Sequence, residues 1–177
     1  MRIMNIRYSN KKKVRGAKRK CHSMISNIYM LTEYFPDSSN HREYWHMHLP
    51  VAQTFIDSTK TPAFARKECI QTLINRVKHL IENRPEKDSK ARVVVCINWP
   101  NLWHSQIIVF FSEDYFKGFF DRNNDYQKWT QLSQKRSLSK ELNLIIPEGF
   151  MENGYLEKIF DEDFKSVSEL WCYGELV

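Results

Sequence analysis

Apolar side chains recur at helical spacing in two stretches of the N-terminal half. Between residues 17 and 35 they fall every three or four positions, and Pro36 then ends the pattern. The second stretch begins at Pro62, runs to about Asn83 and keeps its apolar residues on one face. We therefore predict two amphipathic helices here, together with a short helix over residues 50–56.

The period of the pattern changes after the second helix. Residues 92–98 and 105–111 are nearly continuous apolar runs rich in β-branched side chains, which is typical of strands buried on both faces. The short turn between them permits only an antiparallel pair. The remaining pattern predicts a helix over residues 112–120 and strands over residues 126–129, 142–146, 155–160 and 169–176.

This order of elements predicts an α+β fold. Helices come first along the chain and strands come later, so we expect the N-terminal helices to pack on one face of a mainly antiparallel sheet formed by the C-terminal half. A chain of 177 residues is long enough for one compact domain with a buried core.

The charge distribution separates the N-terminus from the rest of the chain. The formal net charge is +6, but the first 20 residues hold nine basic side chains and no acidic one. The remainder has 18 basic and 21 acidic side chains, a net charge of −3. We therefore divide the chain into a basic, partly disordered arm, residues 1–16, and a single α+β domain, residues 17–177.

The arm is a candidate nucleic-acid interface, because lysine and arginine side chains neutralise backbone phosphates. Binding by so short an arm is expected to weaken steeply with salt and to disappear when residues 1–20 are deleted. Titration of DNA or RNA at several salt concentrations measures this, and unchanged binding by the deletion variant would contradict it. The candidate residues are Lys11, Lys12, Lys13, Arg15, Lys18, Arg19 and Lys20.

The densest group of chemically active side chains lies in residues 36–49. This stretch has neither helical nor alternating apolar spacing, so it is predicted to be an irregular connection. If it is extended, His46 and His48 point to the same side and offer two imidazoles to a divalent metal ion, with Glu43, His41 or a distant carboxylate completing the set. No further ligand follows at a diagnostic spacing. We expect no cofactor, and keep a metal-dependent hydrolase as an alternative that metal analysis of the untagged protein would test.

The other candidates for catalysis are isolated. No Gly-x-Ser-x-Gly motif and no glycine-rich phosphate loop is present. Cys96 and His104 could form a thiol and imidazole pair across the predicted hairpin, but a cysteine inside an apolar run is expected to be packed and inert. The cysteines are spaced singly and are predicted to be reduced residues, mostly in the core: Cys21, Cys69, Cys96 and Cys172.

A non-catalytic protein that binds a protein partner is the leading hypothesis from these residues. Two tryptophans flank a predicted turn, where side chains lie at the surface, and an acidic loop could face a basic partner. The candidate surfaces are those around the His-rich segment 41–48, around the two tryptophans or around the acidic loop, and the candidate binding residues are Trp99, Trp103, Asp161, Glu162 and Asp163. The sequence shows neither a signal peptide nor a membrane span, so we expect a cytoplasmic protein without a membrane partner.

Four segments of the chain read EYWHMHLP at residues 43–50, CIQTLINR at 69–76, NNDYQKW at 123–129 and IPEGF at 146–150. They resemble a family of small bacterial proteins from bacilli described only as a domain of unknown function. The resemblance extends over nearly the whole chain from about Lys11 onward, and it implies no activity, ligand or site residue. Small bacterial proteins of this size often resemble immunity proteins, so an immunity or antitoxin role is the sharpest form of the binding hypothesis.

Overall fold

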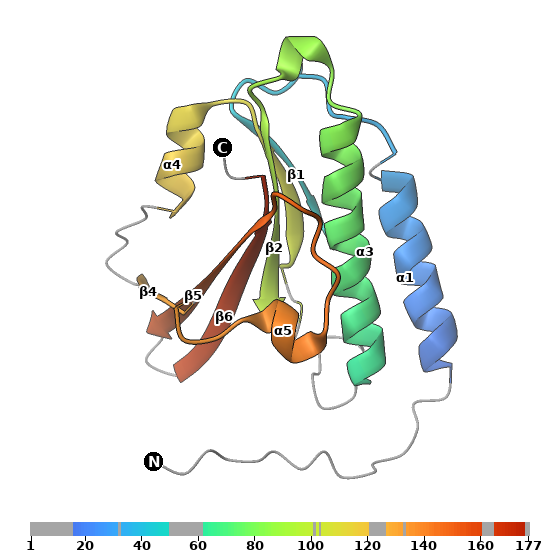
Figure 1. Ribbon diagram of the computed structural model, residues 1–177, viewed down its shortest axis with the longest axis vertical. Helices are drawn as coiled ribbons and strands as arrows, with labels where there is room; N and C mark the ends of the chain where they lie inside the picture. The colour runs from blue at the N-terminus through green and yellow to red at the C-terminus, as the bar shows by residue number, and fades with distance from the viewer. Residues whose placement is uncertain are drawn as a thin grey trace.

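The computed structural model describes residues 16–31, 33–49, 62–100, 102, 104–120, 127–132, 134–160 and 165–175. Within them the chain forms a six-stranded antiparallel sheet with helices against both faces (Figure 1). The helices are α1 (Ala17–Leu31), α3 (Ala63–Glu82), α4 (Glu113–Phe120) and α5 (Leu138–Leu142), with a short 3₁₀ turn, Glu86–Asp88. The strands are β1 (Tyr44–His48), β2 (Arg92–Trp99), β3 (Gln106–Phe110), β4 (Gln127–Gln131), β5 (Met151–Phe160) and β6 (Lys165–Gly174).

The sheet has the strand order β1-β3-β2-β6-β5-β4, which places β1 and β4 at its edges. The α+β fold predicted from the sequence is confirmed, with the N-terminal helices packed against a sheet formed mostly by the C-terminal half. The predicted helix over residues 50–56 lies outside the described residues. None of the described helices has the length and hydrophobicity that crossing a lipid bilayer requires.

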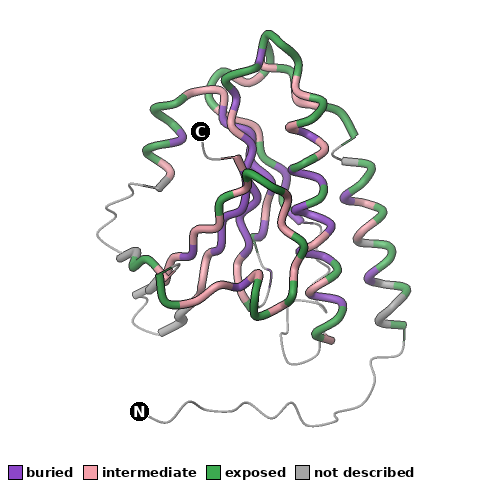
Figure 2. Tube along the Cα trace, in the orientation of Figure 1, coloured by how far each residue is buried: buried purple, intermediate pink, exposed green. Residues whose placement is uncertain are grey.

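The larger core lies between the sheet and the helices α1 and α3. Its side chains come from one face of α3 and from alternate positions of the central strands. Figure 2 shows buried residues along α3 and along the central strands. Burying each such side chain contributes about 1.5–3 kcal/mol. Fully buried residues of this core include Ile70, Leu73, Ile74, Leu80, Val93, Val95, Ile97 and Trp171.

The opposite face of the sheet carries a second, smaller core beneath α4. Because successive strand residues point to opposite faces, Val94 and Cys96 of β2 lie in this core while Val93 and Val95 lie in the larger one. The helix α4 begins after Ser112, whose hydroxyl accepts a hydrogen bond from a backbone N–H one turn later. The prediction that β2 is covered on both faces is confirmed.

The helix α1 is fixed to α3 at its C-terminal end. The Arg76 guanidinium donates a hydrogen bond to the carbonyl of Tyr29 (2.7 Å) and lies 4.2 Å from the centre of the Tyr29 ring. A cation at this position interacts favourably with the negative end of the helix dipole. The first helix is therefore an integral part of the domain.

The prediction of a strand over residues 142–146 is wrong. Ser137 caps the short helix α5, and Asn143 ends it with a left-handed backbone (φ 52°). The backbone N–H and C=O of Ile145 then pair with the side-chain amide of Gln71 on α3, at 2.8 Å each. This segment therefore docks on a helix and not in the sheet.

Candidate functional site

The stretch predicted to be an irregular connection contains the edge strand β1. It pairs antiparallel with β3, with Tyr44 opposite Phe110 and His48 opposite Gln106. Trp45 and Met47 turn toward the larger core, whereas the residues at even-numbered positions face the other side of the sheet. The prediction of an irregular connection was wrong. Trp45, Met47 and Leu49 do alternate with His46 and His48, but this alternation spans only one short strand and was overlooked.

Side chains from three parts of the chain form a continuous row of rings on this side of β1. The ring row consists of Tyr115, Tyr44, His46, His48 and His104. The centres of consecutive rings are 4.9, 5.5, 4.9 and 5.9 Å apart, in that order. All except the half-buried Tyr44 are exposed, so the row presents aromatic surface to a binding partner.

The turn between β2 and β3 positions the last ring of the row. Ser105 is fully buried, its hydroxyl accepts a hydrogen bond from the N–H of Asn98 (3.0 Å), and its carbonyl accepts one from Leu49 (2.7 Å). These bonds tie the turn to β2 and to the end of β1. His104 comes directly before Ser105 and has a left-handed backbone (φ 58°), and its ring lies against His48.

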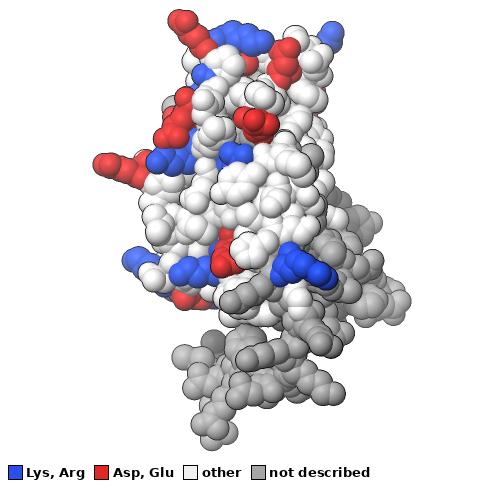
Figure 3. All heavy atoms as spheres, turned by 90° about the vertical axis from the view of Figure 1, so that its right-hand side faces the viewer, with Lys and Arg blue, Asp and Glu red and all other residues white. Residues whose placement is uncertain are grey.

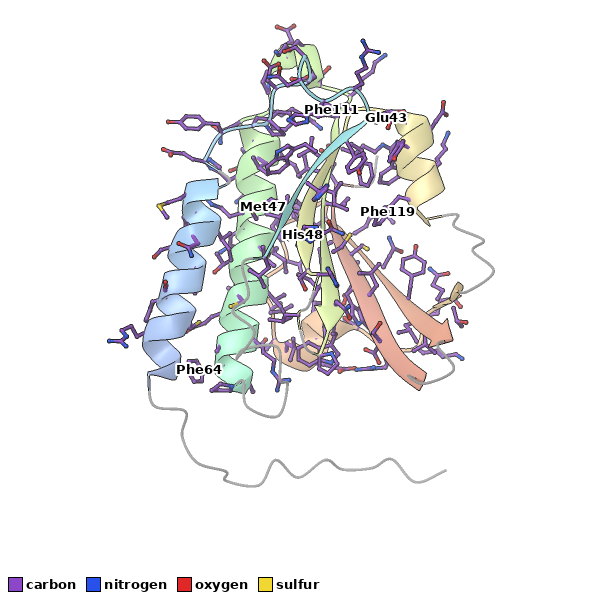
Figure 4. The ribbon with its side chains drawn as sticks, turned by 180° about the vertical axis from the view of Figure 1, so that it is seen from behind. Glu43, Met47, His48, Phe64, Phe111 and Phe119 are labelled. Atoms are coloured by element: carbon purple, nitrogen blue, oxygen red, sulfur yellow. The ribbon has the colours of Figure 1, made fainter. Side chains whose placement is uncertain are left out.

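The backbone of β1 also faces outward at the edge of the sheet. At the start of the strand, the carbonyl of Glu43 accepts a hydrogen bond from Phe111 of the β3 side (2.9 Å). Because an antiparallel edge strand turns alternate residues toward its neighbour, the even-numbered residues direct their N–H and C=O groups away from β3. Figure 4 shows β1 crossing the near side of the molecule. The outward-facing backbone groups belong to Tyr44, His46 and His48.

The surroundings of His48 favour the neutral form of its imidazole. Burial lowers the pKa of His48, and the neighbouring rings of His46 and His104 lower it further. Within the described part of the chain, neither His46 nor His48 forms an ion pair with a carboxylate. These imidazoles therefore lack a nearby negative charge among the described residues.

The predicted metal site is not assembled in the described residues. They contain no group of three or more histidine, cysteine, aspartate or glutamate side chains that could hold a metal ion. His46 and His48 do lie together, but Glu43 precedes β1 at an odd-numbered position, and Figure 4 shows it at the opposite end of the strand from His48.

The four cysteines are free and buried. The Sγ atom of Cys96 lies 3.5 Å from the Sγ atom of Cys172, which is opposite it in the pairing of β2 with β6. Cys96 therefore lies beside a thiol, whereas the sequence suggested the imidazole of His104 as its partner. A hydrogen bond with Cys96 and burial both raise the pKa of Cys172. Burial and the nearby Glu68 raise the pKa of Cys21 to about 11. Thiols with raised pKa values are poor nucleophiles near neutral pH.

The structure places only some of the other predicted binding residues. Trp99 ends β2, is half-buried against the larger core and lies 5.2 Å below the guanidinium of Arg66. Of the basic residues, Arg19 is exposed on α1, which also carries Lys18 and Lys20. The following candidates lie outside the described residues: Trp103, Asp161, Glu162, Asp163, Lys11, Lys12, Lys13 and Arg15.

Among the side chains that the structure describes, those that are charged do not gather on the face formed around α1. In Figure 3 the visible basic and acidic side chains are interspersed on a mostly neutral surface. The described residues on this face therefore do not extend the basic arm into one continuous cationic surface. Nucleic-acid binding by the arm stays a prediction.

Two residues of the ring row were missed in the sequence. Tyr44 lies two positions before His46, so the same period that pairs the histidines in an extended segment would have included it. Tyr115 lies on α4, and only the packing of that helix over the sheet brings its ring to Tyr44. Nothing in the local sequence indicates that contact.

The fold and site together define an α+β protein whose sheet ends in a strand with exposed rings and outward-facing backbone groups. The chain belongs to the family described as "Protein of unknown function (DUF3916)", whose model matches residues 25–175. No curated protein and no solved structure matches the chain significantly. The matched span contains all of the described strands and the ring row, and it begins after the basic arm.

Proposed function

We propose that this protein is a binding protein that recognises a protein partner through the ring row and the outer edge of β1. The observation that carries the proposal is the row of five rings, four of them exposed, beside outward-facing backbone groups. Aromatic rings supply a large contact area at a small cost in side-chain entropy. An edge strand supplies hydrogen-bonding groups that a partner can pair with.

The described side chains that could act as nucleophiles support binding over catalysis. The cysteines are buried, and the hydroxyls of Ser137 and Ser139 both donate to the carboxylate of Glu152, at 2.8 and 2.6 Å. Within the described residues, these hydroxyls bond to each other and to Glu152 and not to a histidine base, which activation of a serine commonly requires. An immunity or antitoxin role is the sharpest form of the proposal, and it requires that the partner be a toxin.

Site-directed photo-cross-linking in the native cell tests this function. A photoreactive phenylalanine analogue at position 46 or 115 is expected to form an adduct with one and the same protein. Truncating a ring near the centre of an interface costs at least about tenfold in affinity. Combining the probe at position 115 with Tyr44→Ala is therefore expected to reduce the adduct by about that factor.

A probe at position 23 is the matched control, because Ser23 is exposed on α1 and lies on the other side of the sheet from the ring row. It is expected to give no adduct with that protein. Equal labelling at positions 23 and 46, or the absence of any adduct at 46 and 115, would contradict the proposed function.

A further inference from the structure

Among the described residues, the backbone groups on the outer edge of β1 have no neighbouring strand and the imidazoles of His46 and His48 have no ion pair with a carboxylate. Within the described residues, β3 alone pairs with β1. The rings of His46 and His48 are exposed, and their centres are 4.9 Å apart. The carboxylate of Glu113 on the adjacent helix α4 is already paired, with Arg92 at 3.0 Å and Lys117 at 3.6 Å.

We propose that an extended, acidic segment of the partner adds to the sheet as a strand beside β1, with its Asp or Glu side chains against His46 and His48. This inference rests on the proposed function and specifies the chemistry of the partner. Backbone hydrogen bonds to the edge supply affinity in this mode of recognition, and alternate side chains supply specificity. Every second side chain of the added strand lies on the side of the ring row.

Charge complementarity is the reason for an acidic partner. An opposite charge within about 4–6 Å of a titratable group favours its charged form and shifts its pKa by about 1–3 units. In the free protein, burial, His46 and His104 all disfavour the imidazolium of His48. A carboxylate from the partner reverses this balance, so binding takes up protons and strengthens as the pH falls through the histidine range.

The other groups around the two imidazoles are compatible with this pH dependence. Tyr44 on β1 and Tyr115 on α4 contribute phenol rings and no carboxylate. On β3, the residue opposite His48 is the uncharged Gln106. The turn contributes the imidazole of His104, which lies beside His48 and disfavours its charged form in the free protein.

Synthetic peptides test the inference on the full chain. The probe is the capped peptide Thr-Glu-Val-Glu-Val-Glu-Thr, and its comparison peptide carries Gln in place of each Glu. Amide resonances of β1 report strand addition in NMR titrations, and the same titrations give the affinity. Since a shift of one pKa unit corresponds to tenfold in affinity, we expect the Glu peptide to bind at least about tenfold more tightly at about pH 5.5 than at about pH 7.5. The Gln peptide is expected to bind with little pH dependence.

Two variants assign the effect to the imidazoles. The double variant His46→Gln, His48→Gln is expected to lose the pH dependence and to keep the weak binding shown by the Gln peptide. The control His22→Gln changes an exposed histidine on α1 and is expected to behave as the unaltered protein.

Three results would overturn the inference. Equal affinity for the Glu and Gln peptides at both pH values would contradict an acidic partner. If neither peptide shifts the amide resonances of β1, strand addition is contradicted. Self-association that weakens on acidification assigns the edge to a second copy of the chain. The proposed function survives the first two if the photo-cross-linked adducts form, so the two failures are distinguishable.

Discussion

Replacing Gly174 with alanine is expected to lower the free energy of unfolding by about 3 kcal/mol. A Cβ atom at this position would lie 2.4 Å from the carbonyl oxygen of Val93 and 2.9 Å from the Cα of Val94. Both atoms belong to the backbone of β2, which is buried on both faces of the sheet. The clash can be relieved only by moving that strand, and the cost of overpacking a buried site is correspondingly large.

Gly118 provides a matched control for this substitution. It is exposed on α4, and a Cβ atom there would meet no atom within 4 Å. Alanine favours helix over glycine by about 0.5–1 kcal/mol, so Gly118→Ala is expected to stabilise slightly. Urea denaturation of the two variants measures both changes. A loss below about 0.5 kcal/mol for Gly174→Ala would contradict the close backbone approach described for β2 and β6.

Replacing Glu152 with glutamine is expected to cost about 2 kcal/mol near neutral pH, because the carboxylate accepts several charge-assisted hydrogen bonds. Its donors are the hydroxyls of Ser137, Ser139 and Tyr173 and the backbone N–H of Ser139, at distances from 2.6 to 3.0 Å. These bonds join α5 to β5 and β6. Because the carboxylate is only half-buried, we expect the loss in free energy of unfolding to lie in the lower part of the range for hydrogen bonds to charged groups.

The contribution of Glu152 to stability depends on pH. Burial acts to raise the pKa of this carboxyl group, but the hydrogen bonds from Ser139, Ser137 and Tyr173 outweigh burial, and the net pKa lies below its usual 4.5. The stabilisation is therefore complete above about pH 4.5 and is lost as the pH falls through the lower pKa of the folded protein.

Urea denaturation across this pH range compares the unaltered protein with Glu152→Gln. The difference in the free energy of unfolding is expected to shrink on acidification. Glu148→Gln, at an exposed position, is the control and is expected to change stability by less than about 0.5 kcal/mol. A constant difference between the unaltered protein and Glu152→Gln down to about pH 2 would contradict the proposed role of the charge.

The spacing of apolar residues was sufficient to predict the helices and strands whose burial is uniform along their length. The helix α3 buries one face along its whole length, and β2 is covered on both faces. The spacing of apolar residues within each element therefore identifies it as a helix or a strand. The short turn after Trp99 likewise requires an antiparallel partner for β2. These elements form the centre of the larger core, and they make the fold class predictable.

Periodicity failed where partners distant in the sequence decide the structure. The apolar residues around Ile145 suggest a strand, but the side-chain amide of Gln71 takes the backbone bonds that a neighbouring strand would have provided. The strand β1 exists because β3 pairs with it, although its outward side carries histidine and tyrosine. In both cases a tertiary contact outweighs a weak local preference.

Patterns along the chain were enough to predict the fold class, the segregation of positive charge into the N-terminal arm and the shared direction of His46 and His48 in an extended segment. Each follows from the order of residues along the chain and the geometry of one element. The folded molecule alone shows that this segment lies at a sheet edge, where Tyr115 and His104 extend the histidine pair into a row. The positions of those two rings depend on how α4 and the turn before β3 pack against β1, and no local periodicity encodes that packing.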